Sequence, residues 1–399
     1  EFQRWWTAPA VSKSDCEQVG ESLLHEMDWI GFAKREAEAH AFFDRVLGLN
    51  LVRGAAQETN TSWSRLTEQE LNHSIDRHML DWQLIFGANA GSCFSQGKWV
   101  ASNASLPYDN KARWQNSCSY AVNRSHRHWY GWDWQAAHPD KCAMTSKRMD
   151  VFVKSPCELI AGKSILILGD SISFNFAVSM LKLLGHDDIP ETNQGHKDYV
   201  YHVCGNTTSV VYIRNDCAGV NCRCGDFCSK FWDRIWNFDF VIINRGAHVK
   251  GSTNLQSFRE DMLTFSQEYT ERSRGLTHTP TLFWRTSPPG HWSCDKVKGR
   301  HYLPIPPEKW PDRANGERLS KGRYKWHLFT EFNTIALAVL ESTLDVRKVR
   351  FVHAAAYAGL RADRHQGGGD CLHYCMPGPT DEWARLFFYQ AGLEVKASR

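Results

Sequence analysis

The sequence lacks a long apolar stretch. No run of about 18 consecutive apolar residues occurs in its 399 residues, and a helix needs a run of that length to cross a bilayer. We therefore expect no membrane-spanning helix in this sequence. Its first residues also show no signal peptide, so a leader or membrane anchor that precedes Glu1 in the native protein would not be visible.

The sequence also lacks a strong excess of charge, internal repeats and low-complexity segments. Its formal net charge is only +3, which provides no broad basic surface for nucleic acid. We therefore exclude nucleic acid as the main partner. The length allows one large globular domain or two of ordinary size, and the oligomeric state is left open.

Cysteines and glycosylation sequons are abundant. The chain has 13 cysteines, and disulfides persist in oxidising compartments. An odd count leaves one cysteine unpaired or paired outside the chain. Five sequons add glycosylation candidates at Asn60, Asn72, Asn103, Asn123 and Asn206. We expect a protein of the secretory pathway, in the Golgi lumen or outside the cell.

Five of the cysteines are close together in the sequence. They are Cys204, Cys217, Cys222, Cys224 and Cys228, a spacing that suits either disulfides or a zinc cluster. Because the compartment is expected to be oxidising, we favour disulfides and predict no metal site.

Three regions follow along the chain. Apolar residues at helical intervals over 14–48 predict one or two helices, so we assign 1–92 to an N-terminal helical appendage or stem. Residues 93–157 are rich in Trp, Asn and Ser, contain four cysteines and predict an irregular, disulfide-held subdomain. Residues 158–399 form the third region. The 17 tryptophans suit sugar stacking or ordinary aromatic packing.

The third region alternates between strand and helix patterns. Strands are predicted at 164–168, 209–213, 240–244, 281–286 and 349–353, and helices at 172–184, 255–272, 324–344 and 381–391. This alternation favours an α/β fold, a three-layer α/β/α sandwich with a mostly parallel central sheet. Functional residues of such sheets gather at the carboxyl ends of the strands.

Ser171 occupies such a position. It lies in "KSILILGDSISFNF" (163–176), where a strand of β-formers runs through Gly169 and Asp170 into a helix. Serine is a favoured helix N-cap and also a possible nucleophile, and we expect Ser171 to fill both roles. A nucleophilic serine needs a base and a group that orients the base.

Asp370 and His373 supply a candidate pair for that purpose. They lie in "GGGDCLHYCMPGPTDEW" (367–383), between a run of glycines and a Pro-Gly pair, so we expect both side chains to come from one loop turn. Their spacing lets the carboxylate hold the imidazole while its second nitrogen faces the serine. A surface salt bridge is the alternative. Cys371 and Cys375 flank the histidine and suggest that disulfides fasten the loop.

The combination of these motifs resembles the SGNH (GDSL-type) hydrolase superfamily. Within it, "GDSISFN" (169–175), "WRTSPPGHW" (284–292), "RADRH" (361–365) and "DCLHYCMPGPTDEW" (370–383) resemble the PC-esterase branch with the plant trichome-birefringence-like polysaccharide O-acetyltransferases. Upstream, "GKWV" (97–100) and "WDWQAAHPDKC" (132–142) resemble the segment that precedes GDS in those proteins. The resemblance covers about residues 93–392.

The resemblance implies a Ser171–His373–Asp370 triad that transfers an acetyl group through an acetyl-serine to a sugar hydroxyl. It implies an oxyanion hole as well, for which the Ser171 backbone N–H, Asn244 and Gly246 of "INRGAH" (243–248) are candidates. Asn175 and Arg285 are further candidates for the oxyanion or substrate site. The substrates would be a polysaccharide or oligosaccharide and an unidentified acetyl donor, with no cofactor.

Two other functions use the same features. An O-acetyl esterase needs the same triad with water as the acceptor, and a glycan-binding protein would keep the fold without turnover. The triad does not distinguish transferase from esterase, and neither the acceptor position nor the disulfide connectivity follows from the sequence.

The chain departs from the family pattern at two places. Phe174 stands where the plant proteins usually have the Arg of GDSxSRN, and "INRGAH" differs from their N-x-G-x-W-W pattern. Acceptor specificity is therefore not carried over. His248 and His291 follow predicted strands as alternative bases, but neither has an aspartate at a useful spacing in the sequence.

Overall fold

The computed structural model describes residues 97–101, 132–136, 155–189, 199–217, 231–249, 255–288, 290–291, 328–345, 348–367 and 370–397. The chain divides into two compact units, Glu1–Met79 and Leu80–Arg399, and all described residues belong to the second. The helices predicted over 14–48 and the sequons at Asn60, Asn72, Asn103 and Asn123 lie outside the described residues, and the domain boundary at 92 stays a prediction.

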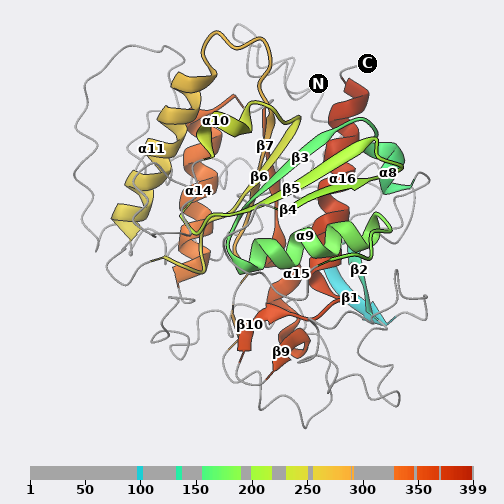
Figure 1. Ribbon diagram of the computed structural model, residues 1–399. Coiled ribbons are helices and arrows are strands. Elements are labelled where there is room, and N and C mark those ends of the chain that lie inside the picture. The colour runs from blue at the N-terminus through green and yellow to red at the C-terminus, as the bar shows by residue number, and fades with distance from the viewer. Residues whose placement is uncertain are drawn as a thin grey trace, which may run out of the picture. The chain divides into compact units, whose positions relative to one another are not determined.

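A six-stranded sheet forms the centre of the second unit (Figure 1). Its strand order is β4-β5-β3-β6-β7-β8. The strands are β4 (Tyr199–Val203), β5 (Thr208–Arg214), β3 (Ser164–Gly169), β6 (Phe240–Ile243), β7 (Thr281–Arg285) and β8 (Val349–Val352). All neighbours pair parallel except β4, which is antiparallel to β5. The predicted α/β class with a mostly parallel sheet is confirmed.

The central strands are buried along almost their whole length. Residues 165–168 of β3 and all of β6 are buried apolar residues, the composition that parallel strands covered on both faces require. In the register of the sheet, Gly169 at the end of β3 faces Arg214 of β5, and Leu168 faces Ile243 of β6. The carboxyl ends of β5, β3 and β6 therefore meet at one edge.

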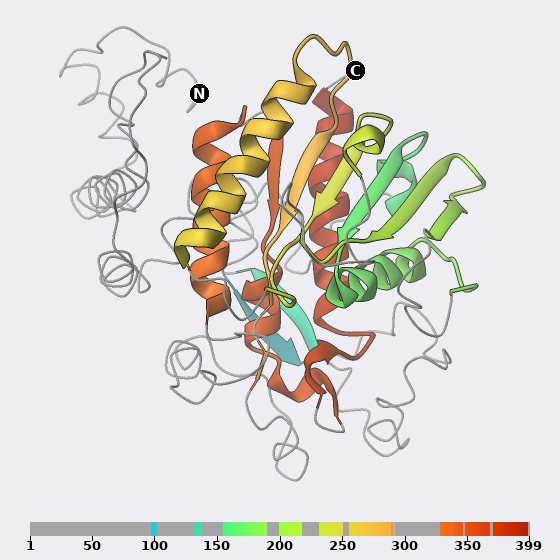
Figure 2. The ribbon, with the colours of Figure 1, turned by 60° about the vertical axis from the view of Figure 1, so that its left-hand side comes forward.

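The helices pack in two pairs, α9 (Ser171–Leu183) with α16 (Pro379–Ala397) and α11 (Leu255–Ser273) with α14 (Phe329–Thr343). In the sheet, β5 lies on one side of β3, whereas β6, β7 and β8 follow one another on its other side. Right-handed crossovers then place α9 on the face opposite α11 and α14, and Figure 2 shows the two pairs on either side of the sheet. Among the described helices, none is both long and apolar enough to span a membrane.

Shorter elements complete the described part of the chain. They are α8 (Pro156–Leu159), α10 (Trp232–Ile235), α15 (Ala354–Gly359), η8 (Ala362–Arg364) and the small sheets of β1 (Gly97–Ala101) with β2 (Trp132–Ala136) and of β9 (His365–Gly367) with β10 (Asp370–Tyr374). The prediction of a loop turn at 370–373 is wrong, because these residues belong to β10. Its buried residues, Cys371, Leu372 and Tyr374, hold the segment as a strand despite the preceding glycines.

Within 93–157, β1 and β2 form an antiparallel pair, and the expectation of an irregular subdomain over this segment stays a prediction. Trp99 of β1 faces Trp134 of β2, with ring centroids 5.6 Å apart. The Trp99 indole donates a hydrogen bond to the backbone oxygen of Tyr357 at 3.1 Å, and the Arg361 guanidinium lies 4.7 Å from the Trp99 ring. This hydrogen bond and the cation–π contact thus attach the strand pair to residues 357–361.

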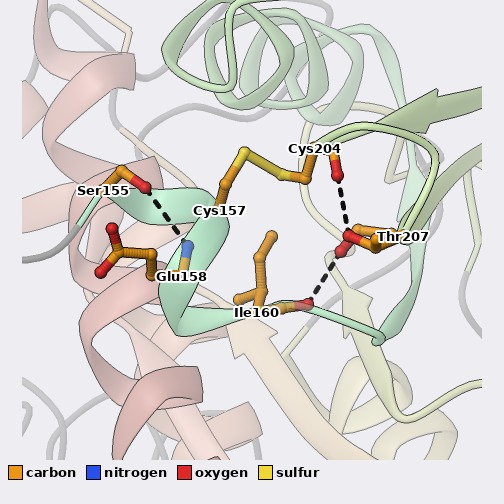
Figure 3. The surroundings of a disulfide bond; sticks show 7 residues. Ser155, Cys157, Glu158, Ile160, Cys204 and Thr207 are labelled. Atoms are coloured by element: carbon orange, nitrogen blue, oxygen red, sulfur yellow. Dashed lines mark hydrogen bonds between the residues drawn. A yellow bond between two sulfur atoms is a disulfide. The ribbon is translucent and has the colours of Figure 1, made fainter.

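A disulfide joins Cys157 of α8 to Cys204 in the turn between β4 and β5 (Figure 3). Beside it, the buried Thr208 hydroxyl donates to the backbone oxygen of Ile160 at 2.9 Å. Asn206, the sequon residue that the structure describes, is exposed in the same turn. The disulfide therefore ties the start of the domain to the edge of the sheet.

Three further described cysteines, Cys217, Cys371 and Cys375, are also disulfide-bonded. Cys204 and Cys217 belong to the cysteine cluster that is compatible with zinc, so these two are disulfide cysteines rather than thiolate ligands. Cys222, Cys224 and Cys228 lie outside the described residues.

We expect the Cys157→Ser/Cys204→Ser variant to be less stable by about 2–4 kcal/mol, because the cross-link restricts the unfolded chain. Urea unfolding followed by tryptophan fluorescence measures the change. The double variant is a more specific test than reduction, which also opens the other disulfides. An unchanged free energy of unfolding would show that the disulfide does not stabilise the fold.

Candidate active site

Ser171 is the first residue of α9, directly after β3 and Asp170. Asp170 is the N-cap of this helix: its carboxylate accepts a hydrogen bond from the Ile172 backbone N–H at 2.9 Å. The expectation that Ser171 caps the helix is therefore wrong. Because the aspartate of the GDS motif fills that role, the Ser171 hydroxyl is left for another contact.

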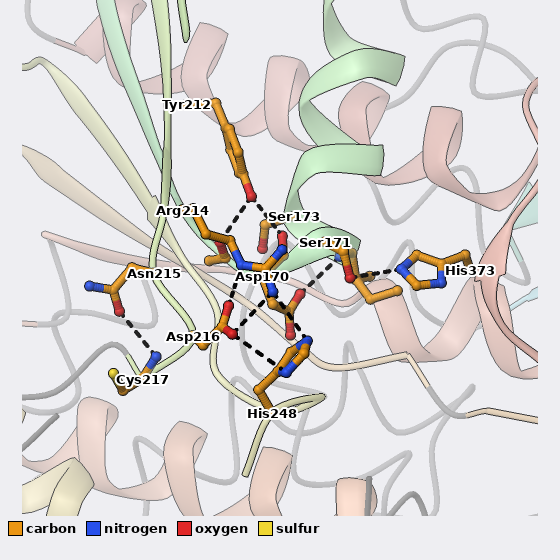
Figure 4. Close-up of polar contacts among 12 residues, drawn as sticks. Asp170, Ser171, Ser173, Tyr212, Arg214, Asn215, Asp216, Cys217, His248 and His373 are labelled. Atoms are coloured by element: carbon orange, nitrogen blue, oxygen red, sulfur yellow. Dashed lines mark hydrogen bonds and ion pairs between the residues drawn. The ribbon is translucent and has the colours of Figure 1, made fainter. Parts of the chain in front are cut away.

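The backbone before Ser171 is closely packed. A Cβ atom at Gly169 would lie 2.1 Å from the Ser173 hydroxyl oxygen, so only glycine fits at the end of β3. The Tyr212 hydroxyl lies 3.1 Å and 3.0 Å from the carbonyl oxygens of Gly169 and Asp170 (Figure 4), so its one O–H proton is shared between these two acceptors. These contacts fix the strand-to-helix turn that carries Ser171.

The structure brings Ser171, His373 and Asp370 into one hydrogen-bonded row. The Ser171 Oγ lies 2.7 Å from His373 Nε2, and His373 Nδ1 lies 2.8 Å from Asp370 Oδ2. The carboxylate accepts the Nδ1–H, which leaves Nε2 with a lone pair that faces the serine hydroxyl. All three residues are partly exposed, so a substrate can reach the serine.

Asp370 is fixed from two sides. Its other carboxylate oxygen accepts the backbone N–H groups of Leu372 at 3.1 Å and His373 at 3.0 Å. Burial raises the pKa of Asp370, but the hydrogen bond and charge of His373 and the two backbone N–H groups lower it to about 2. Since this is below the ordinary 3.8, the carboxylate contributes stability above about pH 4, which is lost as the pH falls towards 2.

Asn175 connects the serine helix to the histidine strand. Its buried side-chain amide donates to the backbone oxygen of Tyr374 at 3.4 Å, next to His373. This contact gives Asn175 a structural task, and its predicted contact with substrate or oxyanion stays a prediction.

Asn244 and Gly246 lie at the carboxyl end of β6. The Asn244 amide nitrogen donates to the backbone oxygen of Arg285 at 2.7 Å and to the Ser287 hydroxyl at 3.0 Å. Gly246 is in close contact with the same serine, because a Cβ atom there would lie 1.9 Å from the Ser287 Oγ. Both N–H bonds of the Asn244 amide are thus in use, and an oxyanion role for either residue stays a prediction.

Arg285 is completely buried at the end of β7. Its guanidinium donates to the Ser173 hydroxyl at 2.9 Å and to the Thr286 backbone oxygen at 3.1 Å. Burial lowers its pKa to about 10, while the charge of Asp170 acts in the opposite direction. Within the described residues it forms no ion pair, and its burial favours a structural role over contact with a substrate carboxylate.

A second polar cluster lies beside the GDS turn and consists of Arg214, Asp216 and His248. Arg214 and Asp216 form a two-pronged ion pair, His248 Nδ1 lies 3.4 Å from Asp216 Oδ2, and Arg214 donates to His248 Nε2 at 3.3 Å. Figure 4 shows this cluster on the side of Ser171 away from His373. His248 therefore has an aspartate partner, which sequence spacing missed because Asp216 follows a different strand.

The other alternative base, His291, does not lie at the serine. It is buried and lies 2.6 Å from His365.

Phe174, the departure from the family pattern, is buried, and its ring centroid lies 5.2 Å from that of Tyr212 and 5.7 Å from that of Tyr199. An arginine there would carry its charge into this aromatic group. Among the described residues, no three His, Cys, Asp or Glu side chains gather as metal ligands.

Comparison with known proteins bears on the chemistry of this site. Residues 231–390 match the PC-esterase family, described as a GDSL/SGNH-like acyl-esterase family found in Pmr5 and Cas1p. The chain is also 20% identical over 374 residues to xyloglucan O-acetyltransferase 4 of Populus trichocarpa, an alignment that covers 79% of this chain and 84% of that protein.

The matched region contains Asp370, His373, Asn244, Gly246 and Arg285, whereas Ser171 precedes it. The predicted PC-esterase resemblance is confirmed, and so is the prediction of an enzyme that transfers or hydrolyses acyl groups. The catalytic roles of the individual residues remain predictions.

We expect Gly169→Ala to destabilise the protein by about 1–3 kcal/mol, because the added methyl group overpacks the contact with Ser173. Ser173→Gly removes the opposing atoms; by itself it costs about 1 kcal/mol for a glycine in a helix and about 1–3 kcal/mol for the hydrogen bond that the buried Arg285 loses. The double variant should therefore be less destabilised than the sum of the two single changes. Urea unfolding of all four proteins measures this coupling, and simple additivity would contradict the proposed contact.

Proposed function

We propose that this protein is a polysaccharide O-acetyltransferase of the secretory pathway that uses Ser171, His373 and Asp370 as a catalytic triad. The observation that carries the proposal is the hydrogen-bonded row from Asp370 through His373 to Ser171. The PC-esterase match and the similarity to a xyloglucan O-acetyltransferase support the reaction class. The disulfides support the compartment.

The first half of the reaction forms an acetyl-serine. His373 Nε2 accepts the Ser171 hydroxyl proton as Oγ attacks the carbonyl carbon of the acetyl donor. The tetrahedral intermediate collapses when the bond to the donor's leaving group breaks, and the leaving group takes the proton from His373. Asp370 holds the ring in the tautomer that this step needs and stabilises the imidazolium.

The second half reverses these roles. His373 accepts the proton of a sugar hydroxyl, whose oxygen attacks the acetyl-serine carbonyl. The ester bond to Ser171 then breaks, and the serine oxygen regains its proton from His373. The reaction needs no cofactor. If water takes the place of the sugar, the product is acetate and the enzyme is an esterase, so the exclusion of water from the acetyl-serine decides the outcome.

Both tetrahedral intermediates carry a negative oxygen. The Ser171 backbone N–H at the start of the 13-residue helix α9 is our first candidate donor, because the helix dipole favours negative charge there. Asn244 and Gly246 remain candidates as well. For Asn244 to donate to the oxyanion, its amide has to give up the hydrogen bond to the Arg285 oxygen or to the Ser287 hydroxyl. Binding of the acetyl group would have to induce this change.

We expect Ser171→Ala to abolish acetyl transfer and acetyl-ester hydrolysis, with a loss of about 10³-fold or more. Asp370→Asn should lose about 10³–10⁴-fold, because it no longer selects the tautomer of His373. The assay follows acetyl groups by mass spectrometry with a chromogenic acetyl ester and candidate oligosaccharides. Ser164→Ala, at the opposite end of β3, is the matched control.

Acetylated oligosaccharide would support transfer, whereas free acetate alone would favour the esterase. A third outcome is unchanged acetyl chemistry in Ser171→Ala together with retained glycan binding. It would contradict the triad and favour a protein that only binds glycans.

We also propose that the cluster of Arg214, Asp216 and His248 contacts the acceptor. It flanks Ser171 opposite the general base, and the His248 side chain is 32% exposed. In the N-x-G-x-W-W pattern of the plant proteins, His248 stands at the first tryptophan. The substitution places a hydrogen-bonding ring where the plant proteins have an indole, so it should alter which acceptor is used.

We expect His248→Trp to change KM for acceptor oligosaccharides by about tenfold or to change the preferred acceptor, because a lost polar contact costs about 1.4 kcal/mol. Hydrolysis of a small chromogenic acetyl ester should stay within about twofold, since that reaction needs no sugar. His202→Trp, on the exposed position of β4, is the control. An equal loss in both assays would show that His248 supports the triad instead.

A further inference from the structure

Two buried histidines lie directly behind the strand of His373. His365 begins β9, and His291 follows β7 along the chain. Nδ1 of His291 lies 2.6 Å from Nε2 of His365, and each residue is only 7% exposed. The two ring nitrogens are therefore in hydrogen-bond contact away from water.

The outer nitrogen of each ring faces a backbone carbonyl. Nε2 of His291 lies 2.8 Å from the oxygen of Gly359, and Nδ1 of His365 lies 3.0 Å from the oxygen of His373. A carbonyl oxygen only accepts hydrogen bonds, so both outer nitrogens must carry a proton.

Counting protons then determines the charge. A neutral imidazole has one N–H, and in two neutral rings both protons would be used on the carbonyls. Two lone pairs would then face each other across 2.6 Å. A third proton between Nδ1 of His291 and Nε2 of His365 converts this repulsion into a charge-assisted hydrogen bond.

We infer that His291 and His365 share a third proton, carry one positive charge together and act as positioning residues for His373. The positioning role rests on the proposed function of His373, whereas the proton count does not. His365 contacts the backbone oxygen of His373. The pair therefore fixes the position of the His373 backbone, and through it the position of the ring that contacts Ser171.

The surroundings of the pair contain charges of both signs. Burial, the neighbouring His291 and the charge of His373 together hold the pKa of His365 well below its ordinary value, whereas the carbonyl of His373 and the carboxylate of Asp370 act in the opposite direction. Among the described residues, the charges of Asp370 and His373 act on His365, and the Tyr374 ring centroid lies 4.4 Å from that of His365. Arg361, Asp363 and Arg364 precede His365 closely in the chain.

Most of these groups are already engaged. Arg361 and Asp363 form a buried ion pair at 2.8 Å, Arg364 donates to the Pro377 oxygen, and the Tyr374 hydroxyl lies 3.5 Å from the Ala358 oxygen. Asp370 is hydrogen-bonded to His373 and Leu372 as well, and its charge acts on His365 and offsets the shared charge. Only the charged pair can form all three hydrogen bonds together: to the Gly359 oxygen, between the two rings, and to the His373 oxygen. These bonds favour retention of the shared proton, whereas burial favours its loss.

Loss of the shared proton has a definite consequence. As the pH rises through the pKa of the pair, the central contact becomes two opposed lone pairs, and the rings must separate or one carbonyl contact must break. Separation would move the backbone of His373, and a displacement of about 1 Å is enough to cost about 10²-fold in rate. Activity should therefore fall on the alkaline side.

The proton count is tested on the full chain labelled with ¹⁵N, by long-range ¹H–¹⁵N correlation spectra of the histidine rings between about pH 5 and 9. We expect three exchange-protected ring N–H signals from the pair, assigned by their change in His291→Asn. Only two such signals throughout this range would overturn the inference.

The His291→Asn variant separates charge from position. An asparagine amide N–H can donate to Nε2 of a neutral His365, which still donates to the oxygen of His373. We expect the shared-proton signal to disappear and kcat/KM for an acetyl ester to lose its alkaline decline, with no more than about a tenfold loss at neutral pH. His202→Asn on β4 is the control.

The outcomes are distinguishable. Three ring protons combined with an alkaline decline that persists in His291→Asn would contradict the positioning role. Inactivity of the wild-type protein towards every acetyl ester would contradict the proposed function, and the ring-proton count would still decide the charge of the pair.

Discussion

The parallel pairing of β3 with β5 and β6 is the constraint on which the candidate site depends. Because Gly169 faces Arg214 and Leu168 faces Ile243, the three chain segments leave the sheet at one edge. Burial on both faces makes this register costly to change. Ser171, Asp216 and His248 therefore come together although they follow three different strands, and the reversal of winding direction at β3 opens the edge to a ligand.

A contact between residues 202 positions apart completes the site. His373 reaches Ser171 because its own segment is held from several directions: by the Asp370 carboxylate on the ring and backbone, by Asn175 on Tyr374, and by His365 on the His373 carbonyl. The disulfide-bonded Cys371 and Cys375 fasten the same strand. The proposed triad is held through its backbone, so it would need little rearrangement before the proposed proton transfer.

Local sequence patterns predicted the parallel strands and the long helices well, but they did not predict the antiparallel strands or the cap of α9. The five parallel strands and the four long helices follow from apolar runs and helical periodicity, and the strand ends lie within about one residue of the predicted positions. Helix α16 continues six residues beyond its predicted end, and the predicted start of α14 at 324 lies outside the described residues. The antiparallel edge strand β4 and the antiparallel pairs of β1 with β2 and of β9 with β10 are not predicted, because their stability comes from partners elsewhere in the chain, such as Tyr357 for Trp99. The cap of α9 was misplaced by one residue, since Asp170 and Ser171 are both favoured N-cap types.

By itself the sequence determined the fold class and identified Ser171, Asp370 and His373 as residues worth testing, because these follow from periodicity and short motifs. Tertiary structure alone decided that Arg285 is buried, that Asn175 binds a backbone carbonyl, that Asp216 meets His248, and that His291 and His365 share one hydrogen bond. The physical reason is that hydrogen-bond partners and burial depend on distances in space, and sheet register and helix packing set those distances between residues far apart in the chain.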